Sequence, residues 1–158
     1  MKIKLKDRLN VVRSFLSEET TVALATVNED GTPRSTPLFF ISDSDLHLYW
    51  FSSVSSTHSR NCERSPRASL AVFGSTARWQ EIRGIQMEGL VSKVTDRRVR
   101  RDIADRYRGR YALNTVLGIA LRRSSLYEFT PLWLRWIDNT ERFGYRFEFA
   151  FGTSKLIG

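Results

Sequence analysis

Short β-rich runs, each closed by a turn signal, constrain the fold of this chain more than any other feature of its sequence. The clearest example is TTVALATV at residues 20–27, followed by the turn sequence NEDG at residues 28–31 and a second β-rich run at residues 32–41. The glycine of such a turn adopts positive φ readily, so the two runs are expected to form a hairpin. Pro33 and Pro37 lack the backbone donor, which places the return strand at a sheet edge or at a bulge.

The same alternation of runs and turns continues along the chain. Pro131 separates two further runs near the C-terminus. Strands are expected at residues 46–51, 68–73, 81–94, 125–129, 132–137 and 143–149. Many short strands with regular turns bury their exposed edges by closing into an antiparallel barrel. The pattern therefore predicts a single α+β domain, mostly β, over residues 1–158, ending in a tail at residues 150–158.

Three segments are expected to be helices at the periphery of this barrel. Within residues 1–18, apolar side chains recur every three or four residues at Leu5, Leu9, Val12 and Leu16, which is typical of an amphipathic helix. Two further helices are expected at residues 57–64 and 95–110, the second ending at Gly109. Their candidate capping residues are Ser56 or Thr57 and Thr95 or Asp96.

Composition excludes several classes of protein. Hydrophobic residues make up 41% of the 158 residues, yet no apolar run approaches the ~20 residues that span a bilayer. The first residues are charged without a following apolar stretch, unlike a secretion signal. Cys62 is the only cysteine, so no intrachain disulfide forms, and with His47 and His58 it is too small a set for zinc. We therefore expect a cytoplasmic protein without a metal site.

The net charge of +8 favours an anionic partner. Nucleic acid, an acidic membrane surface and a small phosphorylated ligand all fit this charge. Seven arginines between residues 97 and 110 are the strongest argument for nucleic acid, but Asp102 and Asp105 lie four residues from Arg98 and Arg101. Such pairs are typical of a solvated helix face, and no nucleic-acid-binding motif accompanies them. Nucleic acid is therefore the disfavoured partner.

Four blocks of sequence, in order, resemble the split-barrel flavin proteins of the pyridoxamine phosphate oxidase family. The first is residues 24–33, LATVNEDGTP, and the second joins residues 48–53, LYWFSS, to residues 65–70, SPRASL. The third is residues 83–89, RGIQMEG, and the fourth runs from residue 137 to residue 144. The fourth block, together with Ser56-Thr57-His58, is similar to an uncharacterised bacterial branch of the same superfamily.

This resemblance implies a homodimer of split barrels with two flavin mononucleotides (FMN) in the groove between subunits. It implies that Phe51, Ser52, Ser53, Thr57 and His58 hold the flavin phosphate at the end of a strand and the start of the following helix. A helix start offers free N–H groups and a favourable dipole to an anion. The resemblance also implies that Thr36, Pro37, Leu38 and Phe39 lie against the flavin ring.

The sequence departs from the oxidase pattern at three positions that carry fixed cations there and at one that carries a glutamine. Thr57 and His58 match an Arg-Lys pair, Thr36 matches an arginine and Gly84 matches a glutamine. These departures indicate looser binding or a different phosphate geometry. Oxidation of vitamin B6 itself is disfavoured, because the Arg-x-His element of that activity is missing near the C-terminus.

Three functions are compatible with these observations. The first is a flavin-dependent oxidoreductase of unknown substrate, in which the flavin carries the redox chemistry and no acid or base stands out as catalytic. The second is a carrier or sensor that binds a flavin, the deazaflavin F420 or haem without turnover. The third is a barrel that binds an anion or nucleic acid and has lost the cofactor. His47, beside aromatic residues, is expected to be a half-buried structural residue.

Overall fold

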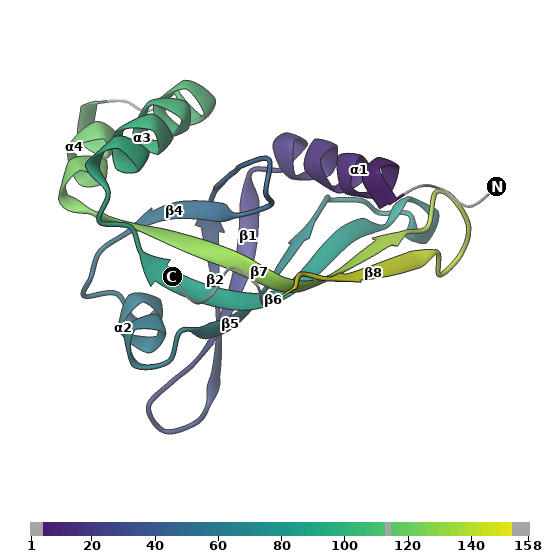
Figure 1. The fold of residues 1–158 in the computed structure, drawn as a ribbon, viewed down its shortest axis with the longest axis horizontal. Coiled ribbons are helices and arrows are strands. Elements are labelled where there is room, and N and C mark those ends of the chain that lie inside the picture. The colour runs from purple at the N-terminus through teal and green to yellow at the C-terminus, as the bar shows by residue number, and fades with distance from the viewer. Residues whose placement is uncertain (1–4, 113–114, 153–158) are drawn as a thin grey trace.

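The computed structural model describes residues 5–112 and 115–152, which form one antiparallel sheet and surrounding helices (Figure 1). The strands are β1 (Thr21–Val27), β2 (Pro33–Phe39), β3 (Ile41–Ser42), β4 (Leu48–Ser52), β5 (Arg67–Phe73), β6 (Arg83–Lys93), β7 (Ser125–Asp138) and β8 (Arg146–Ala150). Their order is β2-β1-β5-β6-β7-β4-β3, with β8 also paired to β7. The expected strands are present, although the run at residues 32–41 divides at Phe40 into β2 and β3.

Phe40 explains why this sheet curls into a half-barrel. Strands β2 and β3 stand at opposite ends of the strand order, yet only Phe40 separates them along the chain. The two ends of the sheet must therefore meet. The ring of Phe40 is buried in the core, and its N–H donates to Thr20 O at 3.3 Å. The mostly β class and the split-barrel architecture are confirmed.

Strand β7 is continuous through Pro131, so the expected break there was wrong. The proline is accommodated by a β-bulge, because Gly89 pairs with Pro131 whereas Glu88 pairs with Trp133. A Cβ on Gly89 would lie 2.2 Å from Thr130 O, so this close approach requires glycine. The extra residue of the bulge changes which side chains of β7 face the core beyond that point. The strand continues past the bulge and is 14 residues long.

The expected helices are present, and one more was missed. The helices are α1 (Leu5–Glu18), α2 (Thr57–Arg64), α3 (Arg97–Tyr111) and α4 (Thr115–Arg123), with the short 3-10 turn η1 (Trp79–Glu81). Ser56 caps α2 and Asp96 caps α3. The expected end of α3 at Gly109 was wrong, because the helix continues to Tyr111 and Ala112 closes it in a left-handed conformation with φ of 43°. Residues 1–4 of the expected first helix and 153–158 of the expected tail lie outside the described residues.

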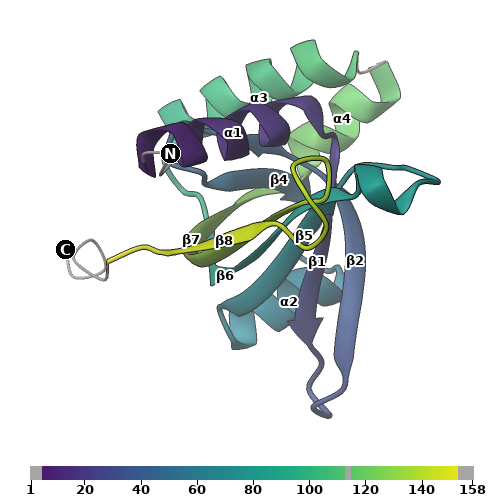
Figure 2. The same ribbon diagram turned by 90° about the vertical axis from the view of Figure 1, so that its right-hand side faces the viewer.

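Helices cover two opposite sides of the barrel (Figures 1 and 2). Helix α1 buries Val12, Phe15 and Leu16 in the main core and packs the partly buried Leu9 against it, which confirms the apolar stripe at Leu9, Val12 and Leu16. Helices α3 and α4 form a second apolar cluster with β3, β4 and β7, and the Tyr107 hydroxyl donates to Phe39 O at 3.1 Å. Helix α2 lies on the other side. Among the described residues, no helix is long and apolar enough to cross a membrane.

Candidate functional site

A serine-rich turn joins the end of β4 to the start of α2. The hydroxyl of Ser56 accepts from Ser59 N at 3.3 Å and donates to Ser59 Oγ at 2.7 Å, which caps the helix. Ser53 and Ser55 are exposed, and their hydroxyls lie 2.8 Å apart. The turn thus presents two exposed hydroxyls, hydrogen-bonded to each other, beside a capped helix start.

His58 lies beneath this turn and not on its surface. Its Nε2 is 2.8 Å from the Oγ of Ser52 and 3.1 Å from the Oγ of Ser56. Burial lowers the pKa of His58, because no carboxylate offsets the cost of placing an imidazolium there. The structure therefore brings Ser52 and His58 together as a neutral hydrogen-bonded pair that supports the turn.

Arg60 is the cation most directly joined to the turn. Its guanidinium donates to the carbonyl oxygen of Ser55 and remains exposed. Thr57, the first residue of α2, is half-buried. A phosphate placed at this turn would meet the hydroxyls of Ser53 and Ser55 and the charge of Arg60. The donor set therefore fits a flavin phosphate, with hydroxyls in the majority and one guanidinium nearby.

The pleat of β4 places Phe51 and Ser52 on opposite sides of the sheet, although both were expected to bind the same cofactor. In β4, Phe51 packs edge-on against Tyr107 of α3 at 5.3 Å between ring centroids, whereas the buried Ser52 contacts His58. Successive residues of a strand face opposite sides of the sheet. A single ligand on one side of β4 therefore meets only one of these two side chains.

The same alternation divides the segment of β2 that was expected to contact a flavin ring. Thr36 and Leu38 are half-buried, and Leu38 packs on the main core. Pro37 and Phe39 are exposed on the other face, where the Phe39 ring lies 4.8 Å from the ring of Tyr111. Only one pair of the four residues can therefore lie along one wall.

Gly84 lies away from the serine-rich turn. It pairs with Phe73 and Ile137 near the start of β6, whereas the end of β6 pairs with the part of β7 next to β4. A Cβ at Gly84 would lie 3.1 Å from Val72 O, so the position is closely packed. The structure does not bring Gly84 together with Ser52 or His58.

The outer face of the sheet is hollowed over β1, β2, β5 and β6. A shallow groove of about 520 Å³ lies there, and part of its lining consists of small side chains from Ala23, Ala25, Ser35, Ser69 and Ala71. Larger side chains, among them Glu88, Trp133 and Arg135, line the rest. Small side chains allow another backbone or a flat ligand to approach the sheet closely.

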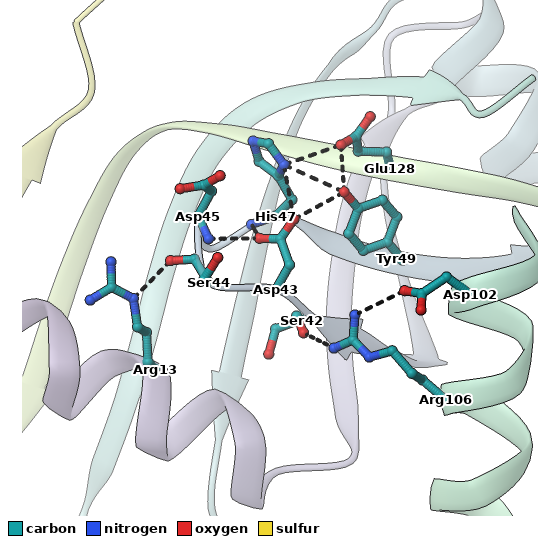
Figure 3. A network of polar contacts seen from close by, with 10 residues as sticks. All are labelled: Arg13, Ser42, Asp43, Ser44, Asp45, His47, Tyr49, Asp102, Arg106 and Glu128. Atoms are coloured by element: carbon teal, nitrogen blue, oxygen red, sulfur yellow. Dashed lines mark hydrogen bonds and ion pairs between the residues drawn. The ribbon is translucent and has the colours of Figure 1, made fainter. Parts of the chain in front are cut away.

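A second polar cluster, around His47, was missed by sequence reasoning as a group (Figure 3). His47 Nδ1 lies 3.1 Å from Glu128 Oε1 and 3.3 Å from Asp43 Oδ2. The Tyr49 hydroxyl lies 2.8 Å from Glu128 Oε1 and 3.0 Å from Asp43 Oδ2. His47 is half-buried, as expected, but Glu128 lies so far along the chain that no spacing rule could have paired them.

The turn that carries His47 is tightly held. Asp43 Oδ1 accepts from the N–H groups of Asp45 and His47, each at 2.9 Å. Leu46 between them has a φ of 67°, a conformation that costs a residue with a side chain about 1–2 kcal/mol. Its side chain is fully buried, so packing and the Asp43 bonds hold the strained backbone and fix where His47 points.

The carboxylates determine the charge of His47. Hydrogen bonds that His47 donates to Asp43 and to Glu128 raise the pKa of His47 to about 10, so the ring is protonated at neutral pH. The hydrogen bond from His47 lowers the pKa of Glu128. At Asp43 burial is the largest single effect and raises the pKa, but the hydrogen bonds and charge of His47 and the hydrogen bond from Tyr49 together lower it. Together the three ionised groups carry a net charge of −1.

An apolar cavity of about 560 Å³ opens beside this cluster. His47 and Glu128 line one side of it, and Arg13, held by Ser44 O at 2.7 Å, lines another. Most of the remaining lining is apolar, from Leu9, Leu46, Pro131, Leu132, Phe149 and Phe151. In Figure 3 the second ring nitrogen of His47, Nε2, points away from Glu128 and Asp43, while a third carboxylate, that of Asp45, also lines the cavity.

Comparisons with known proteins place this fold in one family. The family model for pyridoxamine 5'-phosphate oxidase matches residues 10–137. No curated protein matches the chain.

Solved structures of the same fold come from several bacteria. A protein from Clostridium acetobutylicum, related to general stress protein 26 of B. subtilis and assigned to the pyridoxinephosphate oxidase family, is 16% identical, with a TM-score of 0.67 over 94% of this chain and 96% of its own. HutZ, the haem storage protein from Vibrio cholerae, is 17% identical, with a TM-score of 0.66 over 94% and 95%. A conserved hypothetical protein from Mycobacterium tuberculosis is 18% identical, with a TM-score of 0.71 over 96% and 94%.

At these identities the structural neighbours establish the fold alone, whereas the family model spans most of the sequence. The same blocks that resembled the family in sequence lie in or next to β1, β4, β5, β6 and the end of β7 in one curled sheet. The chain therefore belongs to the pyridoxamine 5'-phosphate oxidase family.

Proposed function

We propose that this protein is a cytoplasmic FMN-binding homodimer that acts as a flavin-dependent oxidoreductase. The observation that carries the proposal is the serine-rich turn, where Ser53 and Ser55 expose paired hydroxyls beside the guanidinium of Arg60. These groups would hold the FMN phosphate, and Ser52 with His58 would support them from below. When bound, the flavin supplies hydride and electron transfer, and the protein orients it.

The outer sheet face supports the homodimer. Its groove of about 520 Å³ is shallow in a single chain, and a second copy laid over the small side chains would deepen it. Cofactor sites are usually concave and enclose most of the ligand. In this arrangement β2 would supply either Thr36 and Leu38 or Pro37 and Phe39 to the flavin ring, according to which face the ring meets.

Titration with FMN tests the proposal directly. The purified protein should be yellow or should quench flavin fluorescence on titration, and light scattering should give the mass of a dimer. Replacing Ser53 and Ser55 together by alanine should weaken FMN affinity by about tenfold, because two phosphate hydrogen bonds are lost. The matched control replaces the exposed Ser75 and Ser92 by alanine and should change nothing.

A colourless protein that neither binds FMN nor quenches it would overturn the flavin assignment. Equal affinities in the two double variants would mean that the protein binds FMN but that its phosphate does not lie at this turn.

Once FMN binding is established, candidate substrates are tested by whether they bleach the bound flavin.

The His47 cavity supports a second candidate function, haem binding. The carboxylates of Glu128 and Asp43 hold Nδ1 of His47, and Nε2 would become a ligand toward the neighbouring cavity once iron displaces the proton that it carries at neutral pH. A carboxylate behind a metal-binding histidine is a common arrangement, because it orients the ring and raises its basicity. Arg13 on the rim would suit an acidic haem side chain.

Haemin titration separates this candidate from the flavin proposal. If it holds, the wild-type protein gives a sharp haem absorption band that is lost in His47→Ala and retained in His58→Ala. FMN affinity should be unaffected by His47→Ala. A band that persists in His47→Ala would exclude His47 as the iron ligand.

A further inference from the structure

The face of α3 that is turned toward α4 carries several arginines. A helix face that packs on a neighbouring helix is usually apolar. Arg97, Arg100, Arg101 and Arg108 recur at spacings that place them on a single helix face. Ala104 lies at the centre of this stripe, and its small side chain leaves space above it. The stripe faces α4, so sequence and packing together form a charged cleft between the two helices.

The cleft has a volume of about 450 Å³ and no acidic side chain among its lining residues in the described part of the chain. Its lining comprises Arg97, Arg100, Arg101, Arg108 and Arg122 with Phe51, Ala104 and Leu121. The acidic residues of α3 are outside the lining. Asp96 caps the helix, Asp102 lies 3.8 Å from Arg106, and Asp105 lies 2.8 Å from Arg108. Asp105 therefore offsets one of the five lining arginines, Arg108, and the other four keep the cleft positive.

Besides the ion-paired Arg108, the cleft is lined by two kinds of arginine. Arg100 is anchored, because its guanidinium donates to Ser124 O at 2.8 Å and lies 5.2 Å from the centre of the Phe51 ring. Arg97, Arg101 and Arg122 form no ion pair within the described residues. Three guanidiniums thus face the cleft with their donors available, above an apolar floor that includes Phe51 and Leu121.

We propose that this cleft binds a diphosphate group, either free or carried on an organic ester. Guanidinium donors match phosphoryl oxygens in pairs, and several of them around one cleft suit an anion with more than one phosphoryl group. The volume lies within the ~300–1,000 Å³ range of small-molecule sites. The cleft is distinct from the proposed flavin phosphate site, since Phe51 and Ser52 face opposite sides of β4.

Calorimetric titration of the full chain with inorganic pyrophosphate, at constant ionic strength, tests the proposal. In Arg97→Gln/Arg101→Gln/Arg122→Gln the affinity should fall at least about tenfold. The matched control, Arg67→Gln/Arg98→Gln/Arg146→Gln, removes the same charge from exposed positions outside the cleft and should stay within about twofold of wild type. Orthophosphate should bind at least about tenfold more weakly than pyrophosphate. ADP that binds more tightly than pyrophosphate identifies an organic ester, and equal affinities identify the free anion.

Several outcomes would overturn the assignment. Equal losses in the two triple variants would mean that net charge, and not the cleft, binds the anion. A single-stranded DNA oligomer that binds more tightly than pyrophosphate and depends on the cleft arginines would replace the small anion with nucleic acid. A parallel loss of FMN affinity in the cleft variant would make the cleft the flavin phosphate site. If the triple variant fails to fold, the single variants Arg97→Gln and Arg101→Gln carry the same comparison with Arg98→Gln.

Discussion

The two histidines of this chain flank the same strand, β4, and differ in charge. His47 precedes β4 and His58 follows it, and both are half-buried. Burial lowers the pKa of His58, whose Nε2 contacts two serine hydroxyls, whereas two carboxylates raise the pKa of His47 to about 10. Similar burial with different partners gives opposite protonation, so the partners and not the depth decide the charge.

This difference separates the tasks that each histidine can perform. A neutral His58 supports the serine-rich turn by hydrogen bonds and contributes no positive charge to a phosphate. A protonated His47 sits in a cluster that is net negative, beside an apolar cavity. The sequence-based expectation was that His58 helps to hold the phosphate. We now propose that His58 acts indirectly, by holding the serine-rich turn in place, and not by contributing a positive charge to the phosphate.

Removing both carboxylates should abolish the difference in charge between His47 and His58 at neutral pH, and this is the largest effect we expect. In Asp43→Asn/Glu128→Gln the pKa of His47 should fall from about 10 to 6.5 or lower, because desolvation remains while the attraction is gone. Asparagine keeps an oxygen that can accept from the backbone of the turn. NMR titration of the ring signals measures the change, with His58 as the internal reference. A His47 that still titrates near 10 in this variant would contradict the carboxylate explanation.

Removing His47 should reduce stability in a pH-dependent way. A raised folded-state pKa contributes stability that is fully present below 6.5 and is lost as the pH rises through about 10. For this partly exposed group we expect His47→Ala to cost about 1–2 kcal/mol at pH 6, after allowance for solvent screening. Urea unfolding at pH 6, 8 and 10 measures the difference.

At acidic pH the carboxylates limit the same contribution. The pKa values of Asp43 and Glu128 are lowered, so their share is present above their ordinary values near 4 and lost as the pH falls through the lowered ones. A deficit of His47→Ala that stays constant from pH 6 to 10 would show that lost packing, and not lost charge, destabilises the variant.

Removing His58 should have the smallest effect and the opposite dependence on pH. His58→Ala removes hydrogen bonds to Ser52 and Ser56 and should cost about 1 kcal/mol at pH 8. Because the folded-state pKa is lowered, the unfolded chain takes up the proton first, and the wild-type advantage should shrink as the pH falls below 6.5. Urea unfolding at pH 8 and pH 5 tests this. A deficit that grows at pH 5 would mean that His58 is charged in the folded state.

Local patterns predicted local structure well. The hairpin of residues 20–39, the apolar stripe of α1, and the caps at Ser56 and Asp96 all depend on residues close together in the chain. The failures arose where distant residues decide. Pro131 remains inside a strand because Gly89 on a neighbouring strand leaves room for a bulge.

The candidate site was less predictable than the fold for the same reason. Ser52 and His58 are close in sequence and contact each other in the structure, whereas the carboxylate of Glu128 reaches His47 only through the pairing of β4 with β7. Phe51 and Ser52 are adjacent in sequence and yet face different helices, because the strand pleat alternates.

The pairing of β4 with β7 also sets an order in time. Strands β1, β2, β5 and β6 pair with one another, so this part of the sheet can form once residue 93 has been synthesised. Strands β3 and β4 are synthesised earlier and pair with each other, but β4 gains its second partner only when β7 is synthesised, some thirty residues after the end of β6. During translation the edge of β6 is therefore unpaired, and the β3–β4 hairpin is not yet joined to the sheet. Unpaired strand edges of this kind can pair with other chains. Strand β7 closes both edges in one step, and the nascent protein depends on its timely arrival.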